Sequence, residues 1–156
     1  RQIRRLERGH PDSAEAAEVV ADTIEQMWLY SGSDTTNLLM ERAMKSLHGK
    51  QPELALKILD GVVALKPNFA EGWNRRAYVH FSQKDYRRAL IDLRRVLAIE
   101  PRHFKAINGL ATILREFGEK RSALKAYRML LDIHPFSTDA QQAVKELERE
   151  VEGESL

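Results

Sequence analysis

The chain has 156 residues, a formal net charge of +2 and no cysteine. The length suits one domain, and a composition that is 43% apolar and 31% charged is typical of a soluble protein with many exposed helix faces. The missing cysteine excludes disulfides, thiolate nucleophiles and cysteine-based metal sites. The small basic excess is weaker than nucleic-acid binders usually carry, and no apolar run reaches the roughly 20 residues that span a bilayer.

The N-terminal 35 residues predict a cap for the chain that follows. A helix is expected from about Ser13 to Tyr30, after a shorter helix that carries Ile3 and Leu6. The chain begins with Arg1 rather than methionine, so we expect that an upstream segment was processed, trimmed or left out. Any export signal would have stood in that segment, so cytoplasm and periplasm both remain open.

Three pairs of helices are expected next, because apolar residues recur with a helical period between helix-breaking residues. Pro52 suits the first position of a helix, Asn68 and Asp85 suit N-caps, and Gly49 and Gly118 suit helix ends. The expected bounds are 37–47 and 52–66, then 69–82 and 85–99, then 103–117 and 120–133.

A mostly charged helix from about Thr138 to Glu152 should follow the three pairs. It carries a narrow apolar stripe, Ala140, Val144, Leu147 and Val151, which is typical of a solvating cap at the end of a helical array.

Three sets of residues recur every 34 positions, and a period of this length is typical of arrays of helical hairpins. Small residues allow the two helices of a hairpin to approach closely, and Trp73 is expected to be a central packing residue of the middle hairpin. The recurring residues are Pro67, Pro101 and Pro135, then Ala43, Ala77 and Ala111, and then Ala55, Ala89 and Ala123.

The stretches AEGWNRRA, DYRRAL and LAIEP in the middle of the chain resemble a tetratricopeptide repeat (TPR). The resemblance covers the chain from about Thr36 to Ser137, and small bacterial proteins of this family are similar at the entry segment too. It implies an all-α fold, a right-handed α-solenoid of helix-turn-helix repeats with N- and C-terminal capping helices. The implied parts are a cap or degenerate half-repeat at 1–35, repeats at 36–69, 70–103 and 104–137, and a C-terminal cap at 138–156.

In TPR arrays the first helix of each repeat lines a concave groove, and the resemblance therefore implies a set of groove residues here. Its first part is apolar and adaptable, and its last part is polar and basic. Tyr78 and Phe81 have an open alternative, which is packing against the N-terminal helix. The implied groove residues are Met40, Met44, Asn74, Tyr78, Phe81, Lys105, Asn108, Thr112 and Arg115.

The two-carboxylate clamp of chaperone-binding TPR domains is not expected. The positions at which that clamp holds lysine, asparagine and arginine carry Met40, Met44, Arg75, Lys105 and Gly109, so that Lys105 alone fits. A single acidic group of a ligand could still meet Lys105 and Arg115.

A second candidate surface is the basic run on the expected convex face, with Arg87, Arg88, Arg94 and Arg95 at its centre. A solvated face explains such a run by default. Its functional alternatives are an acidic protein, an anionic lipid surface or RNA. The glutamates of the C-terminal helix offer a further alternative, head-to-tail self-association that salt would weaken.

No pattern supports catalysis, a metal or a cofactor. The five histidines fall in different elements, and the serines near Gly32 suit a loop and an N-cap because no strand precedes them. We therefore expect a non-enzymatic module that binds a protein or peptide. Self-assembly of a structural protein is the alternative, and nucleic-acid binding ranks third.

Overall fold

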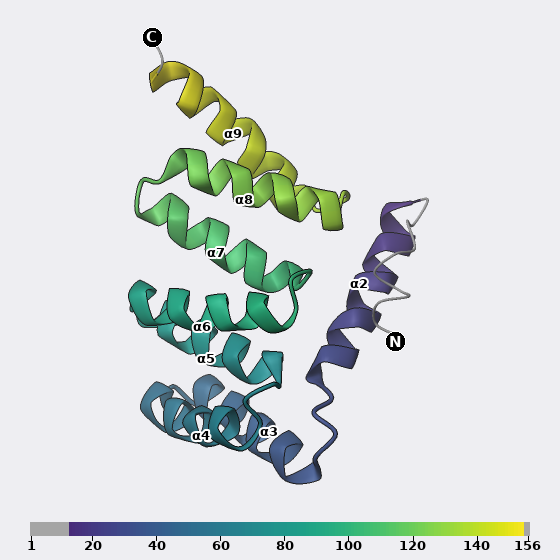
Figure 1. Ribbon diagram of the computed structural model, residues 1–156, viewed down its shortest axis with the longest axis vertical. Helices are drawn as coiled ribbons and strands as arrows, with labels where there is room; N and C mark the ends of the chain where they lie inside the picture. Colours follow the sequence, from purple (N-terminus) through teal and green to yellow (C-terminus); the bar gives the residue numbers. More distant parts are fainter. Residues whose placement is uncertain (1–12, 155–156) are drawn as a thin grey trace. The chain divides into compact units, whose positions relative to one another are not determined.

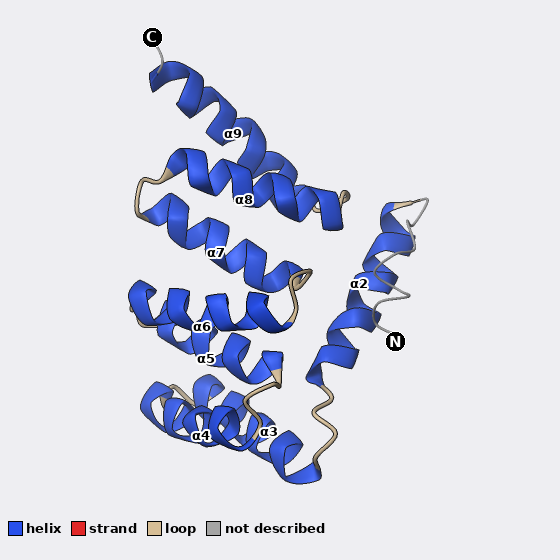
Figure 2. Ribbon diagram, in the orientation of Figure 1, coloured by secondary structure: helices blue, strands red, loops and turns tan. Residues whose placement is uncertain are grey.

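The computed structural model describes residues 13–154, and this part of the chain is built from helices without a strand (Figures 1 and 2). The expected all-α fold is thereby confirmed. The expected short helix with Ile3 and Leu6 lies outside the described residues. The helices are α2 (Ala14–Leu29), α3 (Asp34–His48), α4 (Pro52–Leu65), α5 (Ala70–Ser82), α6 (Tyr86–Ile99), α7 (Phe104–Glu116), α8 (Lys120–Ile133) and α9 (Thr138–Glu154).

The 34-residue period of the sequence is also the period of the helix boundaries. The second helices of the three hairpins, α4, α6 and α8, begin at Pro52, Tyr86 and Lys120, each 34 residues after the last. The first helices α5 and α7 begin at Ala70 and Phe104 with the same spacing. The division of the chain into capping segments and three repeats stays a prediction.

Two compact units make up the chain. The central unit comprises Glu25–Pro101 and therefore holds α3 to α6, while the outer unit combines the residues up to Ile24 with those from Arg102 onward and holds α7 to α9. Helix α2 contributes its first part to the outer unit and its last part to the central unit.

The core of the central unit lies where successive helices pack, α3 on α4, α4 on α5 and α5 on α6. Small residues allow these close crossings, since Ala43, Ala55, Ala77 and Ala89 are all buried. Larger residues fill the space around the first crossing, and the buried cluster there is Met40, Ala43, Ala55, Leu59, Val62 and Val79.

The outer unit repeats this plan, with α8 packed against both α7 and α9. Ala111 and Ala123 are buried at the crossing of its hairpin. The stripe by which α9 is buried is Ala140, Ala143 and Leu147, whereas Val144 and Val151 of the expected stripe are half-buried.

The turn inside each hairpin ends its first helix with a left-handed residue. Lys50, Lys84 and Gly118 have φ angles of 58°, 60° and 76° and stand 34 residues apart. The next N–H in each turn bonds a carbonyl five residues earlier, and such bonds satisfy the last carbonyls of a helix. Gly118 follows the end of α7 and Gly49 is the C-cap of α3, both as expected, although the left-handed residue of the first turn is Lys50.

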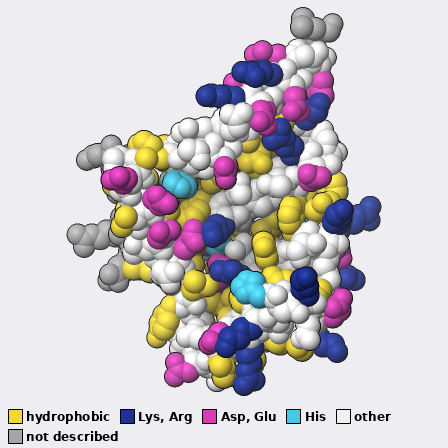
Figure 3. Space-filling model, turned by 180° about the vertical axis from the view of Figure 1, so that it is seen from behind, with side chains coloured by type: hydrophobic (Ala, Val, Ile, Leu, Met, Phe, Trp, Pro, Cys, Tyr) yellow, Lys and Arg dark blue, Asp and Glu magenta, His cyan; other side chains and the backbone are white. Residues whose placement is uncertain are grey.

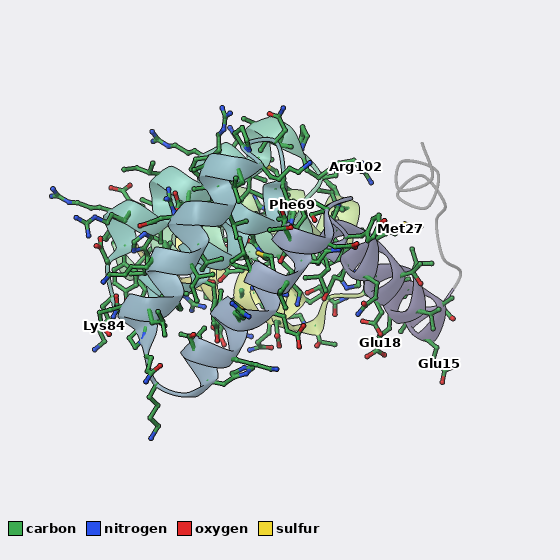
Figure 4. All side chains as sticks on the ribbon, turned by 90° about the horizontal axis from the view of Figure 1, so that it is seen from below. Glu15, Glu18, Met27, Phe69, Lys84 and Arg102 are labelled. Carbon is green, nitrogen blue, oxygen red and sulfur yellow. The ribbon has the colours of Figure 1, made fainter. Side chains whose placement is uncertain are left out.

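The prolines shape the turns between hairpins. Pro67 occupies the second position of a β-turn in which the N–H of Phe69 donates to the carbonyl of Lys66 at 3.0 Å. Asn68 lies inside this turn, so the expectation that it caps α5 is wrong, and Phe69 holds that position without a side-chain cap bond. Phe69 directly precedes α5 and Lys84 follows it, so these two residues flank the helix (Figure 4).

The other expected N-caps are present in the structure. Asp85 accepts a hydrogen bond from the backbone N–H of Arg88 at 3.2 Å, and Ser33 accepts one from Thr36 at 3.3 Å. Pro52 stands in the first turn of α4, where its missing N–H costs nothing.

Gly72 marks the closest approach of α4 and α5. A Cβ atom at this position would lie 2.9 Å from Cγ1 of Val62, whereas a Cβ atom at Gly61 of α4 would meet nothing within 4 Å. We predict that Gly72→Ala destabilises the protein by about 1–3 kcal/mol because it overpacks this contact. Gly61→Ala should stabilise it by about 0.5–1 kcal/mol, the usual gain in helix propensity.

Urea unfolding of the two variants measures both effects. Each substitution adds one methyl group to a helix, so opposite signs isolate the steric contact of Gly72. A Gly72→Ala variant that is as stable as Gly61→Ala would contradict the packing of α5 on α4.

Candidate functional site

The central unit offers the exposed side chains of α3 and α5 as its candidate site. Tyr78 on α5 is 57% exposed, so the helices of the central unit leave much of its side chain uncovered. Met44 on α3 is half-buried. Met40 is only 6% exposed and belongs to the core cluster, so its expected role as a ligand contact does not fit its position.

Arg75 joins α5 to α3 beside Tyr78. Its Nε donates to Oε1 of Glu71 at 2.9 Å, and its Nη1 lies 3.7 Å from Sδ of Met44. Glu71 is only 4% exposed, so this carboxylate holds the guanidinium at a fixed place on the surface. Asn74 donates to the same carboxylate oxygen at 3.2 Å, and its amide group is therefore engaged within the protein.

Phe81 is half-buried and contacts an aromatic ring of the next helix. Its ring centroid lies 5.5 Å from that of Tyr86, with the ring planes tilted by 55°. Tyr78, one turn earlier on α5, has no such cover. The two aromatic residues of the expected groove thus differ, because Phe81 packs within the hairpin while Tyr78 presents its ring to solvent.

The outer unit places the remaining expected groove residues on α7. Lys105 and Asn108 are exposed. The hydroxyl of Thr112 donates to the backbone carbonyl of Asn108 at 2.8 Å and lies 3.3 Å from the hydroxyl of Tyr127. Of the expected groove residues on α7, Lys105 and Asn108 thus have the most exposed side chains.

Arg115 does not present an unpaired charge. Its Nη2 lies 2.8 Å from Oε2 of Glu146 and 3.4 Å from Oε1 of Glu150, both on α9. The hydrogen bond to Glu146 is the main cause that raises the pKa of Arg115. The expectation that Arg115 awaits the acidic group of a ligand omitted these carboxylates.

The basic run on α6 is exposed, as a solvated face would be. Arg87, Arg88, Arg94 and Arg95 all lie on the surface. Arg88 pairs with Asp85 at 3.5 Å, and the Arg95 guanidinium lies 5.6 Å from the centre of the Trp73 ring. Two of the four arginines therefore have partners inside the unit.

The side chain of Trp73 contacts the turn that precedes α5 and is not part of the buried core. It is half-buried, and its Nε1 donates to the carbonyl of Pro67 at 2.9 Å. The guanidinium of Arg76 lies 4.9 Å from the ring centre, close enough for a cation–π contact. Trp73 thus ties α5 to the proline turn that precedes it.

An ionic network around the buried carboxylate of Asp92 crosses the central unit, and the pattern within one helix did not predict the partners of this carboxylate. Asp92 of α6 is 2% exposed and receives two hydrogen bonds from Arg76 of α5, Nε to Oδ2 at 2.9 Å and Nη2 to Oδ1 at 2.8 Å. Nη1 of Arg76 donates to Asp60 of α4 at 3.1 Å, which brings three helices together. The bond to Asp92 raises the pKa of Arg76.

One sequence signal could have located the acidic half of this network. Asp92 stands three residues after Ala89 and four before Val96, on the stripe that α6 buries. A carboxylate on a buried stripe needs a cation or hydrogen-bond donors opposite it. Asp92 is therefore not part of a solvated basic face, as the charge run alone suggested.

Comparison with known proteins places the chain in a family. The tetratricopeptide repeat model matches residues 70–103. A TPR repeat-containing protein of Rhizobium etli is 43% identical over 143 residues, which are 92% of this chain and 69% of that protein. The chain belongs to the tetratricopeptide repeat family.

Solved TPR domains share the fold at low sequence identity. The first TPR of Spaghetti (RPAP3), bound to the HSP90 peptide SRMEEVD, aligns with a TM-score of 0.70 and 17% identity over 74% of this chain and 92% of that one. The TPR2B domain of yeast Sti1, in a complex with pHsp70, aligns with a TM-score of 0.68 and 16% identity over 76% and 99%. These likenesses establish the fold as that of TPR solenoid domains.

Within residues 13–154 of this TPR protein, neither a metal-binding cluster nor a membrane-crossing helix is found. No group of three or more histidine, aspartate or glutamate side chains in that range could hold a metal ion. No helix of the same range combines the length and the apolar character that a bilayer crossing requires.

His80 of the second TPR hairpin adds a pH-sensitive group to the buried network. Its Nε2 lies 3.8 Å from Oδ2 of Asp92. Burial lowers the pKa of His80, and the charges of Arg76 and Arg88 add to this, although the carboxylates of Asp92 and Asp85 oppose it. The folded protein thus disfavours the charged imidazole more than the unfolded chain does.

We predict that His80 makes the protein less stable as the pH falls below about 6.5, the ordinary pKa of histidine. The unfolded chain takes up this proton at a higher pH than the folded protein, so the free energy of unfolding decreases with falling pH. His80→Gln should remove this contribution. Urea unfolding of both proteins between about pH 7 and pH 5 measures the difference in their stability.

The wild type should lose more stability than the variant over this range. A difference between the two proteins that stays constant from neutral to acidic pH would contradict the burial of a neutral His80.

Proposed function

We propose that this chain is a non-enzymatic interaction module that binds a peptide or protein segment on the exposed face of α3 and α5 in its central unit. Membership of the TPR family supports this function. The two solved TPR domains described above are in complexes, one with an HSP90 peptide and the other with pHsp70. The ligands of those proteins support a protein segment as the class of ligand for this chain. They do not identify the ligand.

The observation that carries the proposal is the exposure of Tyr78. An aromatic ring that is 57% exposed on the first helix of a TPR hairpin offers a large contact area with few rotatable bonds. Such residues are enriched among those that dominate binding energy at protein interfaces. Arg75, three residues earlier, lies on the neighbouring part of the same helix surface.

Arg75 and Met44 define the chemistry beside the tyrosine ring. The thioether of Met44 supplies adaptable apolar contact, and the guanidinium of Arg75 supplies donors whose place Glu71 fixes. Because the buried carboxylate of Glu71 already offsets the charge of Arg75, the surface suits a polar acceptor next to an apolar side chain. A pair of free carboxylates would suit it less well.

Lys105 and Asn108 form a separate candidate contact set on α7 of the outer unit. Both are exposed, and the TPR resemblance assigns them to the ligand-binding face. The alternative of head-to-tail self-association has less charge available to it, because Glu146, Glu148, Glu150 and Glu154 are paired with cations of the same unit.

Peptide display against the whole chain, followed by affinity measurements with the selected peptides, tests the proposal. We predict that Tyr78→Ala weakens binding at least about tenfold, as the loss of a dominant aromatic contact does. Tyr30→Ala is the matched control, since Tyr30 is also exposed but lies in the connection between α2 and α3. It should leave the affinities within about twofold of the wild type.

Circular dichroism establishes that both variants are folded. Selected peptides that all bind the folded Tyr78→Ala variant as tightly as the wild type would refute the site.

A further inference from the structure

Helix α9 carries a row of side chains four residues apart that points along one face of the helix. The row is Gln142, Glu146, Glu150 and Glu154, and such spacing places them one above the other. Its three carboxylates face two cations of the same unit, Arg115 at the end of α7 and Lys120 at the start of α8.

The distances form a continuous ladder of ion pairs. Arg115 lies 2.8 Å from Glu146 and 3.4 Å from Glu150, while Lys120 lies 3.7 Å from Glu150 and 2.8 Å from Glu154. Glu150 thus joins the two cations. Two positive charges from different helices of the unit are matched to carboxylates one helical turn apart.

The apolar packing of α9 covers only its first part. Ala140, Ala143 and Leu147 are buried, but from Glu148 to Glu154 no side chain is buried and Val151 is half-buried. Ion pairs at partly exposed sites contribute only about 0.2–1 kcal/mol each, and Gly153 lowers helix propensity by about 1 kcal/mol. The segment 148–154, here called the distal segment, is therefore weakly held.

The surface of α9 shows the same character. Acidic and basic side chains alternate over this helix with little apolar surface between them (Figure 3). Attraction of this kind is screened by salt and can be replaced by other carboxylates of the same spacing.

We propose that Arg115 and Lys120 form a receptor for an acidic helical segment of a partner protein, and that the distal segment of α9 occupies this receptor in the free protein. The partner places carboxylates where Glu150 and Glu154 now lie and displaces the distal segment. Glu146 remains on the part of α9 that Leu147 anchors. The inference rests on the proposed role as an interaction module, but it uses residues of the outer unit alone.

The position of Arg115 supports the proposal. Arg115 lies on the helix face that the TPR resemblance assigns to ligands, and its present partners are carboxylates of the chain itself. A ligand must therefore compete with α9, which lowers the affinity of the free protein for acidic segments by the fraction of time that the receptor is open.

A labelled synthetic peptide with the sequence of residues 138–154 serves as the probe, and fluorescence anisotropy measures its binding to the whole chain. The double variant Glu150→Gln, Glu154→Gln removes the two displaceable carboxylates. We expect it to bind the peptide at least about fivefold more tightly than the wild type, since the competing segment has lost its charge. Adding Lys120→Gln to this variant should abolish the gain.

The matched control is Glu152→Gln, which removes a charge from an exposed position of the same segment but leaves the ion pairs of Glu148, Glu150 and Glu154 intact. It should bind the peptide no more tightly than about twice the wild-type level. A second probe, the same peptide with its glutamates replaced by glutamine, should not bind any of the proteins.

Equal affinity of the wild type and the Glu150→Gln, Glu154→Gln variant would overturn the proposal. An equal gain in the control variant would also overturn it, because net charge alone would then explain the effect. Failure of this inference is distinct from failure of the proposed function, because peptides selected for the central unit depend on Tyr78 and not on Lys120.

Discussion

The interaction on which the central unit depends is the ion pair of Arg76 with the buried carboxylate of Asp92. Two hydrogen bonds join these side chains, and Asp60 adds a third helix to the contact. A buried ion pair often stabilises no more than apolar residues of the same volume would, but the loss of one partner leaves a buried charge and is costly. The pair therefore favours one alignment of α4, α5 and α6 over others.

Successive residues of a helix point about 100° apart, so turning Arg76 toward α6 sets the direction of Arg75 and Tyr78. The candidate binding surface of the central unit thus follows from a contact on the other side of α5.

Several charged side chains of this protein form ion pairs with other side chains of the same unit. Glu71 holds Arg75, Asp92 holds Arg76, and α9 holds Arg115. Each of these groups would be read as solvated or as open to a ligand from its position in the chain alone. On the candidate faces, the ring of Tyr78 and the fixed guanidinium of Arg75 reach the surface in the central unit, and Lys105 and Asn108 are exposed in the outer unit.

The helices could be predicted from the sequence because local signals define them. Proline and glycine mark the turns, and the 3.6-residue apolar pattern marks the helices, so that α8 was predicted at both ends. The prediction that Asn68 caps α5 was wrong, because Asn68 lies inside the turn at Pro67 and the helix begins only after Phe69. The left-handed conformation of Lys50 and Lys84 had no sequence signal, since lysine has no preference for it.

The candidate site was harder to predict, because the surroundings of Met40 and Arg115 are formed by residues of other helices. Which helix faces meet is decided by packing across the whole unit, and periodicity within one helix does not contain that information.

The central claim is that Arg76 and Asp92 act together to align the helices of the central unit. A double-mutant cycle tests it most directly, with Arg76→Met, Asp92→Leu and the combined variant unfolded in urea. Arg76→Met should cost about 3–5 kcal/mol because it leaves the charge of Asp92 buried, whereas Asp92→Leu should cost less because Arg76 reaches the surface and keeps Asp60 as a partner. The combined variant should cost at least about 1 kcal/mol less than the sum of the two. Single losses that simply add, with a coupling below about 0.5 kcal/mol, would contradict the claim.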